Sequence, residues 1–228
     1  MPNNYFRFKQ FTVYQDKSAM KVCTDACLFG AWVASKTSAA KTLDIGAGTG
    51  LLSLMLAQRS AAHIEAVEID EHAFEQSQEN FNTSPWRDRL KIFHVPIQSF
   101  DNGRYDLIIS NPPFYSNDLK SENRKRNLAL HSEALNLEEL LASVKKLLAE
   151  PGSFAVLLPF HRAAYFENLA TKYGLYLQEK VLVKQTPAHD YFRVMYILSN
   201  IDIPREAHQS EIVINDELFK ELLKDYYL

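Results

Sequence analysis

The sequence predicts an α/β fold: a doubly wound, Rossmann-like sheet of seven strands, mostly parallel, with an antiparallel last strand. Short runs of β-branched and apolar residues alternate with amphipathic stretches along the chain, as in parallel strands connected by helices. A glycine-rich stretch, "DIGAGTG" at 44–50, lies where the first strand passes into the first helix. The last two strands are separated by only "KQTPAHDY", which is too short for a helical crossover and indicates an antiparallel hairpin at the sheet edge.

The segments expected to form the sheet share a short, largely apolar character. They are 41–46, 63–69, 90–95, 105–110, 153–159, 175–183 and 192–199. The helices expected between them are 51–59, 72–81, 135–149 and 162–173. Pro151 and Gly152 stop the third helix, and Gly174 ends the fourth. The fourth strand, "YDLIIS", is almost continuously apolar, so we expect it to be buried on both faces of the sheet.

The remaining segments are expected to extend this core within a single domain, 1–228. Residues 1–40 form an N-terminal extension with a short strand (6–13) and a helix (24–35), for which Thr24 or Asp25 is the expected N-cap. Residues 41–200 form the core sheet. Residues 201–228 form a C-terminal tail with a short apolar run and a terminal helix. A chain of 228 residues is within the usual size of one domain.

Composition limits the possible partners. The formal net charge is -3, so a nucleic acid would have to meet a local basic patch. The two cysteines, Cys23 and Cys27, have helical spacing and no histidine cluster nearby, so we expect free thiols and no metal. The N-terminus lacks the apolar core of a signal peptide, and no apolar run approaches the length of a membrane span. We expect a cytoplasmic monomer.

The glycine-rich stretch is the expected cofactor end of the molecule. Glycines at 46, 48 and 50, with Ala47 between them, let the backbone turn tightly and approach a ligand closely. Glu68, roughly 20 residues further on, ends the second strand and can accept hydrogen bonds from ribose hydroxyls. Asp70 competes for that role, but we expect it to cap the following helix. The residue after Glu68, Ile69, is included in the predicted site.

Two cofactors compete for this turn. A nicotinamide dinucleotide needs G-x-G-x-x-G, whereas here Leu51 stands where the third glycine should fall. Asp44 would repel a pyrophosphate but can pair with a cationic α-amino group, which favours S-adenosylmethionine. A turn without a ligand is the remaining alternative. After the third strand, Ile97 is expected either to pack on the cofactor's adenine or to belong to the core, and Gln98 to read the adenine edge.

Three stretches in order carry a resemblance to a known family. "DIGAGTG", "VEID" and "NPPF" (111–114) resemble the class I S-adenosylmethionine-dependent methyltransferases that act on amines, over residues 41–199. In that class N/D-P-P-Y/F is the catalytic motif. Asn111 and the Pro112 carbonyl would then be two acceptors for the hydrogens of a target amine, and Pro112 and Pro113 would stiffen the turn. Phe114 would stack on the target ring. A proline-stiffened turn with an Asn cap is the alternative.

The same motif serves amines of adenine and cytosine and the amide of glutamine. The polar stretch 116–127 follows it directly, and we expect its cations to grip phosphates, unless it is simply a solvated loop. Arg193 in the hairpin is either a second contact or a structural ion-pair partner. The expected substrate-binding residues are Pro113, Tyr115, Lys120, Arg124, Lys125, Arg126 and Arg193.

The N-terminal segment narrows the resemblance. Lys9-Gln10-Phe11, Met20-Lys21-Val22 and the block from Thr24 to Trp32 resemble the opening of the valine-tRNA adenine N6-methyltransferases. The resemblance implies a tRNA substrate, methylated at adenine 37, and places Thr24 and Asp25 in the cofactor pocket. An acidic residue often found after the third strand in this class is missing from 94–98.

Two other functions stay open at this point. One is a protein glutamine N5-methyltransferase acting on a translation factor, although that family normally has a separate N-terminal helical domain. The other is a nucleotide- or RNA-binding protein that has lost catalysis, against which the intact Asn111 and the open glycine turn argue.

Overall fold

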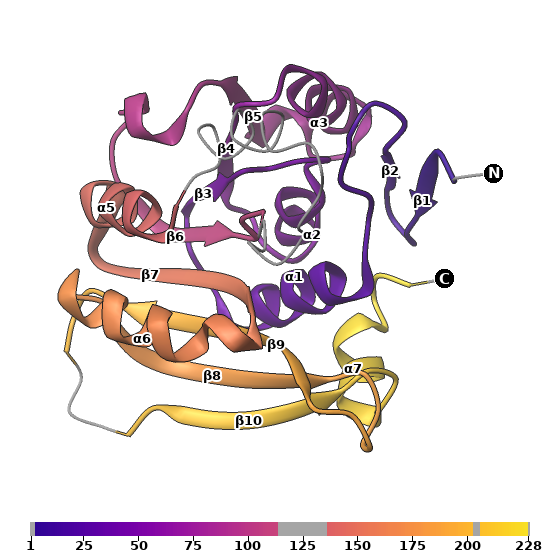
Figure 1. The fold of residues 1–228 in the computed structure, drawn as a ribbon. Helices are drawn as coiled ribbons and strands as arrows, with labels where there is room; N and C mark the ends of the chain where they lie inside the picture. Colours follow the sequence, from indigo (N-terminus) through magenta and orange to yellow (C-terminus); the bar gives the residue numbers. More distant parts are fainter. Residues whose placement is uncertain (1–2, 114–135, 203–205, 228) are drawn as a thin grey trace, which may run out of the picture.

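The computed structural model describes residues 3–113, 136–202 and 206–227. Its centre is an eight-stranded sheet in the order β10-β8-β9-β7-β6-β3-β4-β5 (Figure 1). The strands are β3 (Lys41–Ile45), β4 (His63–Glu68), β5 (Leu90–His94), β6 (Tyr105–Ser110), β7 (Leu148–Pro159), β8 (Tyr176–Lys184), β9 (Tyr191–Ser199) and β10 (His208–Val213). Neighbouring strands are parallel except that β9 runs antiparallel to both β7 and β8. The mostly parallel α/β sheet predicted from the sequence is therefore confirmed.

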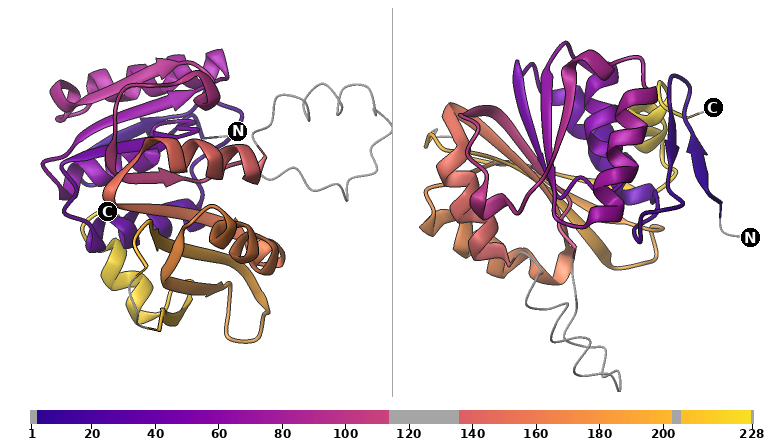
Figure 2. Two further views of the ribbon diagram at one scale, coloured as in Figure 1. Left: turned by 90° about the vertical axis from the view of Figure 1, so that its left-hand side faces the viewer. Right: turned by 90° about the horizontal axis from the view of Figure 1, so that it is seen from above.

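Helices cover both faces of the sheet (Figure 2). On one face lie α1 (Thr24–Lys36), α2 (Leu51–Arg59) and α3 (Glu71–Thr83), and on the other lie α5 (Leu137–Leu147) and α6 (Ala163–Lys172). Each layer has its own hydrophobic core, and alternating residues of one strand serve the two cores: Ile109 faces the α1–α2 side and Ile108 the α5–α6 side. This alternation follows from the period of two in a strand. Short 3-10 turns occur at Arg87–Arg89 (η1), Ile97–Ser99 (η2) and Phe160–Arg162 (η3).

Local sequence accounts for the helix positions. Asn136 and Glu139 form a capping box at the start of α5, which satisfies two backbone N–H groups that the helix itself leaves free. Leu140, Leu141 and Val144 then follow at helical spacing and are fully buried. Asp70 caps α3 by accepting a hydrogen bond from the Ala73 N–H at 2.8 Å, as expected. None of the described helices is long and apolar enough to cross a membrane.

The N-terminal extension differs from the prediction. The expected single strand over 6–13 is a two-stranded hairpin, β1 (Tyr5–Arg7) and β2 (Thr12–Tyr14). The chain reverses because the Phe8 N–H bonds the Phe11 carbonyl at 2.9 Å, and the two rings stack at 4.4 Å. The expectation that Thr24 or Asp25 caps the next helix is wrong: Cys23 is the N-cap of α1, without a side-chain capping bond.

The C-terminal tail contributes to the sheet itself. All seven predicted strands are present, but the short apolar run of the tail forms an eighth, β10, parallel to β8. Ile212 is buried there opposite Val183, which explains why the run joins the sheet. The β8–β9 hairpin is consequently not at the sheet edge, contrary to expectation. The terminal helix is α7 (Glu217–Leu223), which packs beside α1.

Candidate active site

Three motifs meet at the carboxyl ends of adjacent strands. β3 lies between β6 and β4, and Ile45 is in register with both Ser110 and Val67. The glycine turn after β3, Asn111 after β6 and Glu68 at the end of β4 therefore share one edge of the sheet. The Ser110 hydroxyl donates to the Ile45 carbonyl at 2.8 Å, which fastens the start of the proline turn to the strand that bears the glycines.

Asp44 is completely buried just before the glycine turn. Its Oδ2 accepts hydrogen bonds from the Ser53 hydroxyl at 2.7 Å and the Ser53 N–H at 3.2 Å. Its Oδ1 is also buried and has no hydrogen-bond partner within the described part of the chain. Burial raises the pKa of the Asp44 carboxyl to about 7, and the nearby charge of Glu68 adds to this rise. An unpaired buried carboxylate oxygen is costly unless a donor meets it, so this atom fits a cationic amine.

The glycine turn leaves open space above its backbone. Gly46 and Gly48 have positive φ angles of 75° and 58°, and a Cβ built on either meets no atom within 4 Å. Gly50 has a different role, because a Cβ there would lie 2.6 Å from a ring carbon of Phe81 on α3. The first two glycines thus provide a backbone surface that a ligand can approach, and the third permits close packing of α2 against α3.

Glu68 holds the shape of this turn. Its Oε2 accepts from the Gly48 N–H at 2.8 Å, and its Oε1 accepts from the N–H groups of Ile69 at 2.8 Å and Asp70 at 3.0 Å. The carboxylate keeps further lone pairs for ribose hydroxyls. The side chain of Ile69 beside it is 52% exposed. An exposed apolar side chain beside this carboxylate offers an apolar surface on which a ring could pack.

The structure adds two residues that the sequence prediction missed. On α3, the Ser77 hydroxyl donates to the Gly48 carbonyl at 2.8 Å, and the Asn80 amide donates to the Thr49 carbonyl at 2.8 Å. The Asn80 side chain also accepts from the Tyr14 N–H and donates to the Tyr14 carbonyl. Both side chains are fully buried. A polar pair at i, i+3 on the buried side of an amphipathic helix was the signal that could have revealed them.

Asn111 and the prolines lie where they were expected. Asn111 is half-buried, Pro112 is buried and Pro113 is exposed. The Asn111 carboxamide has no hydrogen-bond partner among the residues that the structure describes. The predicted residues after this point lie outside the described ranges: Phe114, Tyr115, Lys120, Arg124, Lys125 and Arg126.

Other predicted site residues have structural partners. Arg193 forms an ion pair with Asp25, with Nε 2.7 Å from Oδ2, so the ion-pair interpretation of Arg193 applies and Asp25 is already paired. Thr24 beside it is exposed. Ile97 is buried in the core with Val67, which is the core alternative that the sequence left open. The Gln98 amide donates to Glu139 at 3.2 Å.

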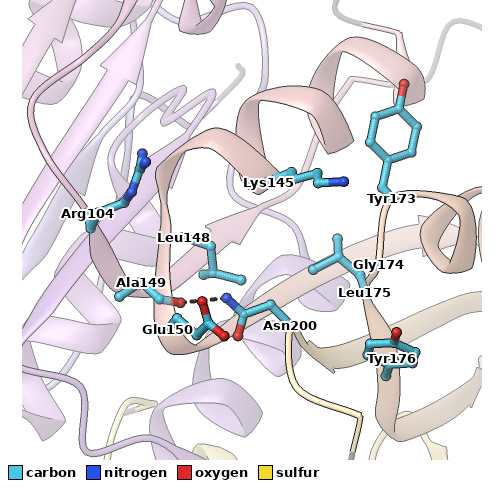
Figure 3. A pocket seen from close by; sticks show the side chains of 10 residues that line it. All are labelled: Arg104, Lys145, Leu148, Ala149, Glu150, Tyr173, Gly174, Leu175, Tyr176 and Asn200. Carbon is cyan, nitrogen blue, oxygen red and sulfur yellow. Dashed lines mark hydrogen bonds between the residues drawn. The ribbon is translucent and has the colours of Figure 1, made fainter.

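A separate surface pocket lies at the opposite edge of the sheet (Figure 3). It has a volume of about 430 Å³ and includes residues before or at the amino ends of three strands: Arg104 before β6, Leu148 of β7 and Tyr176 of β8. Lys145 at the end of α5 and Tyr173 after α6 also line it. Lys145, in the last turn of α5, complements the dipole of that helix.

Within the described residues, no group of three or more His, Cys, Asp and Glu side chains is placed to hold a metal ion. The polar groups that the structure places at this edge are carboxylates, a carboxamide and backbone groups. Asn111 and Pro112 follow β6 at this same edge.

Comparisons with known proteins show the family to which the chain is similar. Residues 28–158 match the family described as methyltransferase small domain. A tRNA1(Val) (adenine(37)-N6)-methyltransferase from Dyadobacter fermentans is 44% identical and covers 100% of this chain and 99% of the relative. A protein of the same name from Flavobacterium johnsoniae is 43% identical, covering 98% of this chain and 99% of the relative.

Solved structures share the fold. A predicted O-methyltransferase from Agrobacterium tumefaciens superposes with a TM-score of 0.66 at 13% identity, covering 88% of this chain and 96% of that one. A putative RNA methyltransferase from Pyrococcus horikoshii superposes with a TM-score of 0.55 at 22% identity, covering 80% of this chain and 83% of that one. At these identities the likeness concerns the fold alone.

Proposed function

The chain belongs to the methyltransferase small domain family, as one of its tRNA1(Val) (adenine(37)-N6)-methyltransferases, and on this premise we propose which of its residues perform the reaction. It transfers a methyl group from S-adenosylmethionine to the exocyclic N6 amine of an adenine in tRNA, adenine 37 of tRNA1(Val). The assignment of roles rests on the pairing of β3 with β4 and β6. This pairing brings the glycine turn, Glu68 and Asn111 to the same edge of the sheet.

The residues at the glycine turn fit S-adenosylmethionine. When bound, this cofactor supplies a methyl group on a sulfonium, which is already a good electrophile. Asp44 would receive the α-amino group on its unpartnered Oδ1, Glu68 would accept from the ribose hydroxyls, and Ile69 would pack on the adenine. The open backbone of Gly46 and Gly48, with Ala47 between them, would lie against the cofactor. Asp25, which pairs with Arg193, and Ile97, which lies in the core, take no part in this proposal.

Asn111 and Pro112 would prepare the target amine. The N6 nitrogen of adenine is conjugated to the ring, so its lone pair is poorly available. Two acceptors that hold its hydrogens, the Asn111 side-chain oxygen and the Pro112 carbonyl, pull the nitrogen toward tetrahedral geometry and aim its lone pair at the methyl. As the bond between N6 and the methyl carbon forms, the bond between that carbon and the sulfonium sulfur breaks, and the positive charge on nitrogen meets dipoles that are already in place. The extra proton on N6 then passes to water. Pro113 fixes the turn, and Phe114 would stack on the adenine.

Methyl transfer from labelled cofactor to tRNA1(Val) tests this proposal. We expect the wild-type protein to label tRNA isolated from cells that lack the modification. Asn111→Ala should lower kcat by at least about a hundredfold, since positioned acceptors of this kind contribute that order of rate, with unchanged affinity for S-adenosylhomocysteine. Equal activity of the two proteins would remove Asn111 from the chemistry. The glutamine alternative is an outcome of the same experiment, because label would then appear in protein rather than RNA.

We further propose that the enzyme acts as a cytoplasmic monomer on its tRNA substrate. Support comes from the site itself, since the described residues given a role above lie together at one edge of one sheet within a single chain. Light scattering of the purified protein with and without tRNA measures its oligomeric state directly. A dimer at the concentration used for the activity assay would contradict the proposed monomer.

A further inference from the structure

We propose that the exposed face of α6, together with Arg162 at its N-cap, is the surface along which the phosphate backbone of the tRNA docks. The inference rests on the proposed function, because it names the part of the protein that holds the substrate of that same site. It concerns residues that neither the motifs nor the comparisons assign.

The start of α6 lies beside the catalytic motif. β7 is the neighbour of β6 on the side away from the glycine turn, and Ser110 is in register with Val156. β7 ends at Pro159, and the 3-10 turn η3 (Phe160–Arg162) leads directly into α6. Because β6 and β7 are parallel, this turn emerges at the same edge of the sheet as Asn111. An RNA that inserts one base at Asn111 therefore passes close to Arg162.

The outward side chains of this segment suit a polyanion. Tyr165 and Lys172, seven residues apart on α6, are exposed on one side of the helix, and His161 of η3 is exposed just before it. Neither Arg162 nor Lys172 has an ion-pair partner among the described residues. Glu167 is the acidic residue of α6, and it is occupied by Lys180 at 2.7 Å and by the Tyr196 hydroxyl at 2.5 Å.

Tyr165 adds a contact that a simple cationic patch lacks. Its side chain is 50% exposed on the first turn of the helix, three residues after Arg162. An exposed ring beside a guanidinium allows a base to stack while its phosphate is neutralised. Arg162 and Lys172 are about 15 Å apart along the helix axis, so they would meet different phosphates.

The opposite face of the sheet disfavours RNA. α3 and its cap carry Asp70, Glu71, Glu75 and Glu79, and the helix contains no Lys or Arg. Lys17 offsets only part of this charge through Glu75 and Glu79. Figure 2 shows α3 and α6 on opposite sides of the sheet. A phosphate backbone is repelled from the first side and accepted on the second, so a protein with a net charge of -3 can still bind tRNA in one orientation.

Charge reversal tests this surface. In Arg162→Glu and in Lys172→Glu we expect the KM for tRNA to rise roughly threefold to tenfold. The slope of the logarithm of the binding constant against the logarithm of the salt concentration should become less steep by about one phosphate contact. The values of kcat and the affinity for S-adenosylhomocysteine should not change. Lys91→Glu is the matched control, since Lys91 is an exposed cation without an ion pair among the described residues, on β5 at the far side of the sheet.

The outcomes separate the inference from the function on which it rests. A wild-type protein that methylates tRNA, with KM values for Arg162→Glu and Lys172→Glu equal to that of Lys91→Glu, would overturn the α6 surface alone. A wild-type protein that transfers no methyl to tRNA would overturn the proposed function and this inference together. A rise confined to the two α6 variants supports the docking surface.

Discussion

Asp44 is a buried carboxyl whose ionisation should be coupled to cofactor binding. Its pKa of about 7 in the free protein lies far above the ordinary value of 3.8, mainly because of burial. A cationic amino group at Oδ1 favours the ionised form and lowers that pKa. Binding should therefore release a proton below about pH 7, and the affinity for S-adenosylhomocysteine should fall as the pH drops from 7 to 5.5. Calorimetry in buffers of different ionisation enthalpy measures both effects.

The control for this prediction is Asp44→Asn, which should abolish proton release and weaken binding at all pH values. The stability of the free protein changes with pH in the opposite direction to the affinity for the cofactor. Between about pH 4 and 7 the folded state binds more protons at Asp44 than the unfolded state, so its contribution to stability falls as the pH rises through that window. An affinity that is constant from pH 5.5 to 8 would contradict the role given to Oδ1.

Gly46 and Gly50 should fail in different ways when replaced by alanine. Both have positive φ, so each substitution costs about 1–2 kcal/mol of backbone strain. At Gly50 the new methyl also collides with Phe81 at 2.6 Å, so Gly50→Ala should lower the Tm more. At Gly46 the methyl enters open space on the ligand side, so Gly46→Ala should lose more affinity for S-adenosylhomocysteine. If the two variants have the same ratio of Tm loss to affinity loss, the division of roles is wrong.

At the scale of elements, α3 supports the glycine turn from behind. Asn80→Ala would leave the Thr49 carbonyl and both backbone groups of Tyr14 without their partners. We expect a loss of about 1–3 kcal/mol in the free energy of unfolding and weaker cofactor binding, measured by thermal unfolding with and without S-adenosylhomocysteine. Asn82→Ala is the matched control, because Asn82 is exposed on the same helix. An equal effect of both variants would contradict the bridging role of Asn80.

The elements of the core were predictable from sequence because they follow strong local rules. Apolar, β-branched runs and the amphipathic stretches between them predicted the strands and helices. The three motifs predicted which edge of the sheet carries the candidate site. β10 was missed because it begins with polar residues and only its end is apolar, so the segment resembles a surface strand or loop. The Asp25–Arg193 pair joins residues 168 positions apart, which no local pattern reveals. Ser77 and Asn80 were missed since polar residues normally mark the exposed side of a helix.

At the scale of the whole molecule, the two chain ends close over the helix layer that supports the cofactor turn. The Lys9 N–H bonds the Tyr226 carbonyl at 2.9 Å, and Phe6 lies against Tyr227. The buried Tyr226 hydroxyl donates to the Met55 carbonyl of α2. Figure 1 shows both ends on the same side of the molecule. The N-terminal block that resembles the tRNA enzymes is thus part of the structure that holds α2 and α3 in place.

The central claim is that this protein methylates adenine 37 of tRNA1(Val). Nucleoside analysis of tRNA from cells with and without the protein tests it most directly, with purified tRNA1(Val) digested to locate the modified position. We predict N6-methyladenosine at position 37 only when the protein is present, and its absence when the protein carries Asn111→Ala. An identical N6-methyladenosine content at that position with and without the protein would contradict the account.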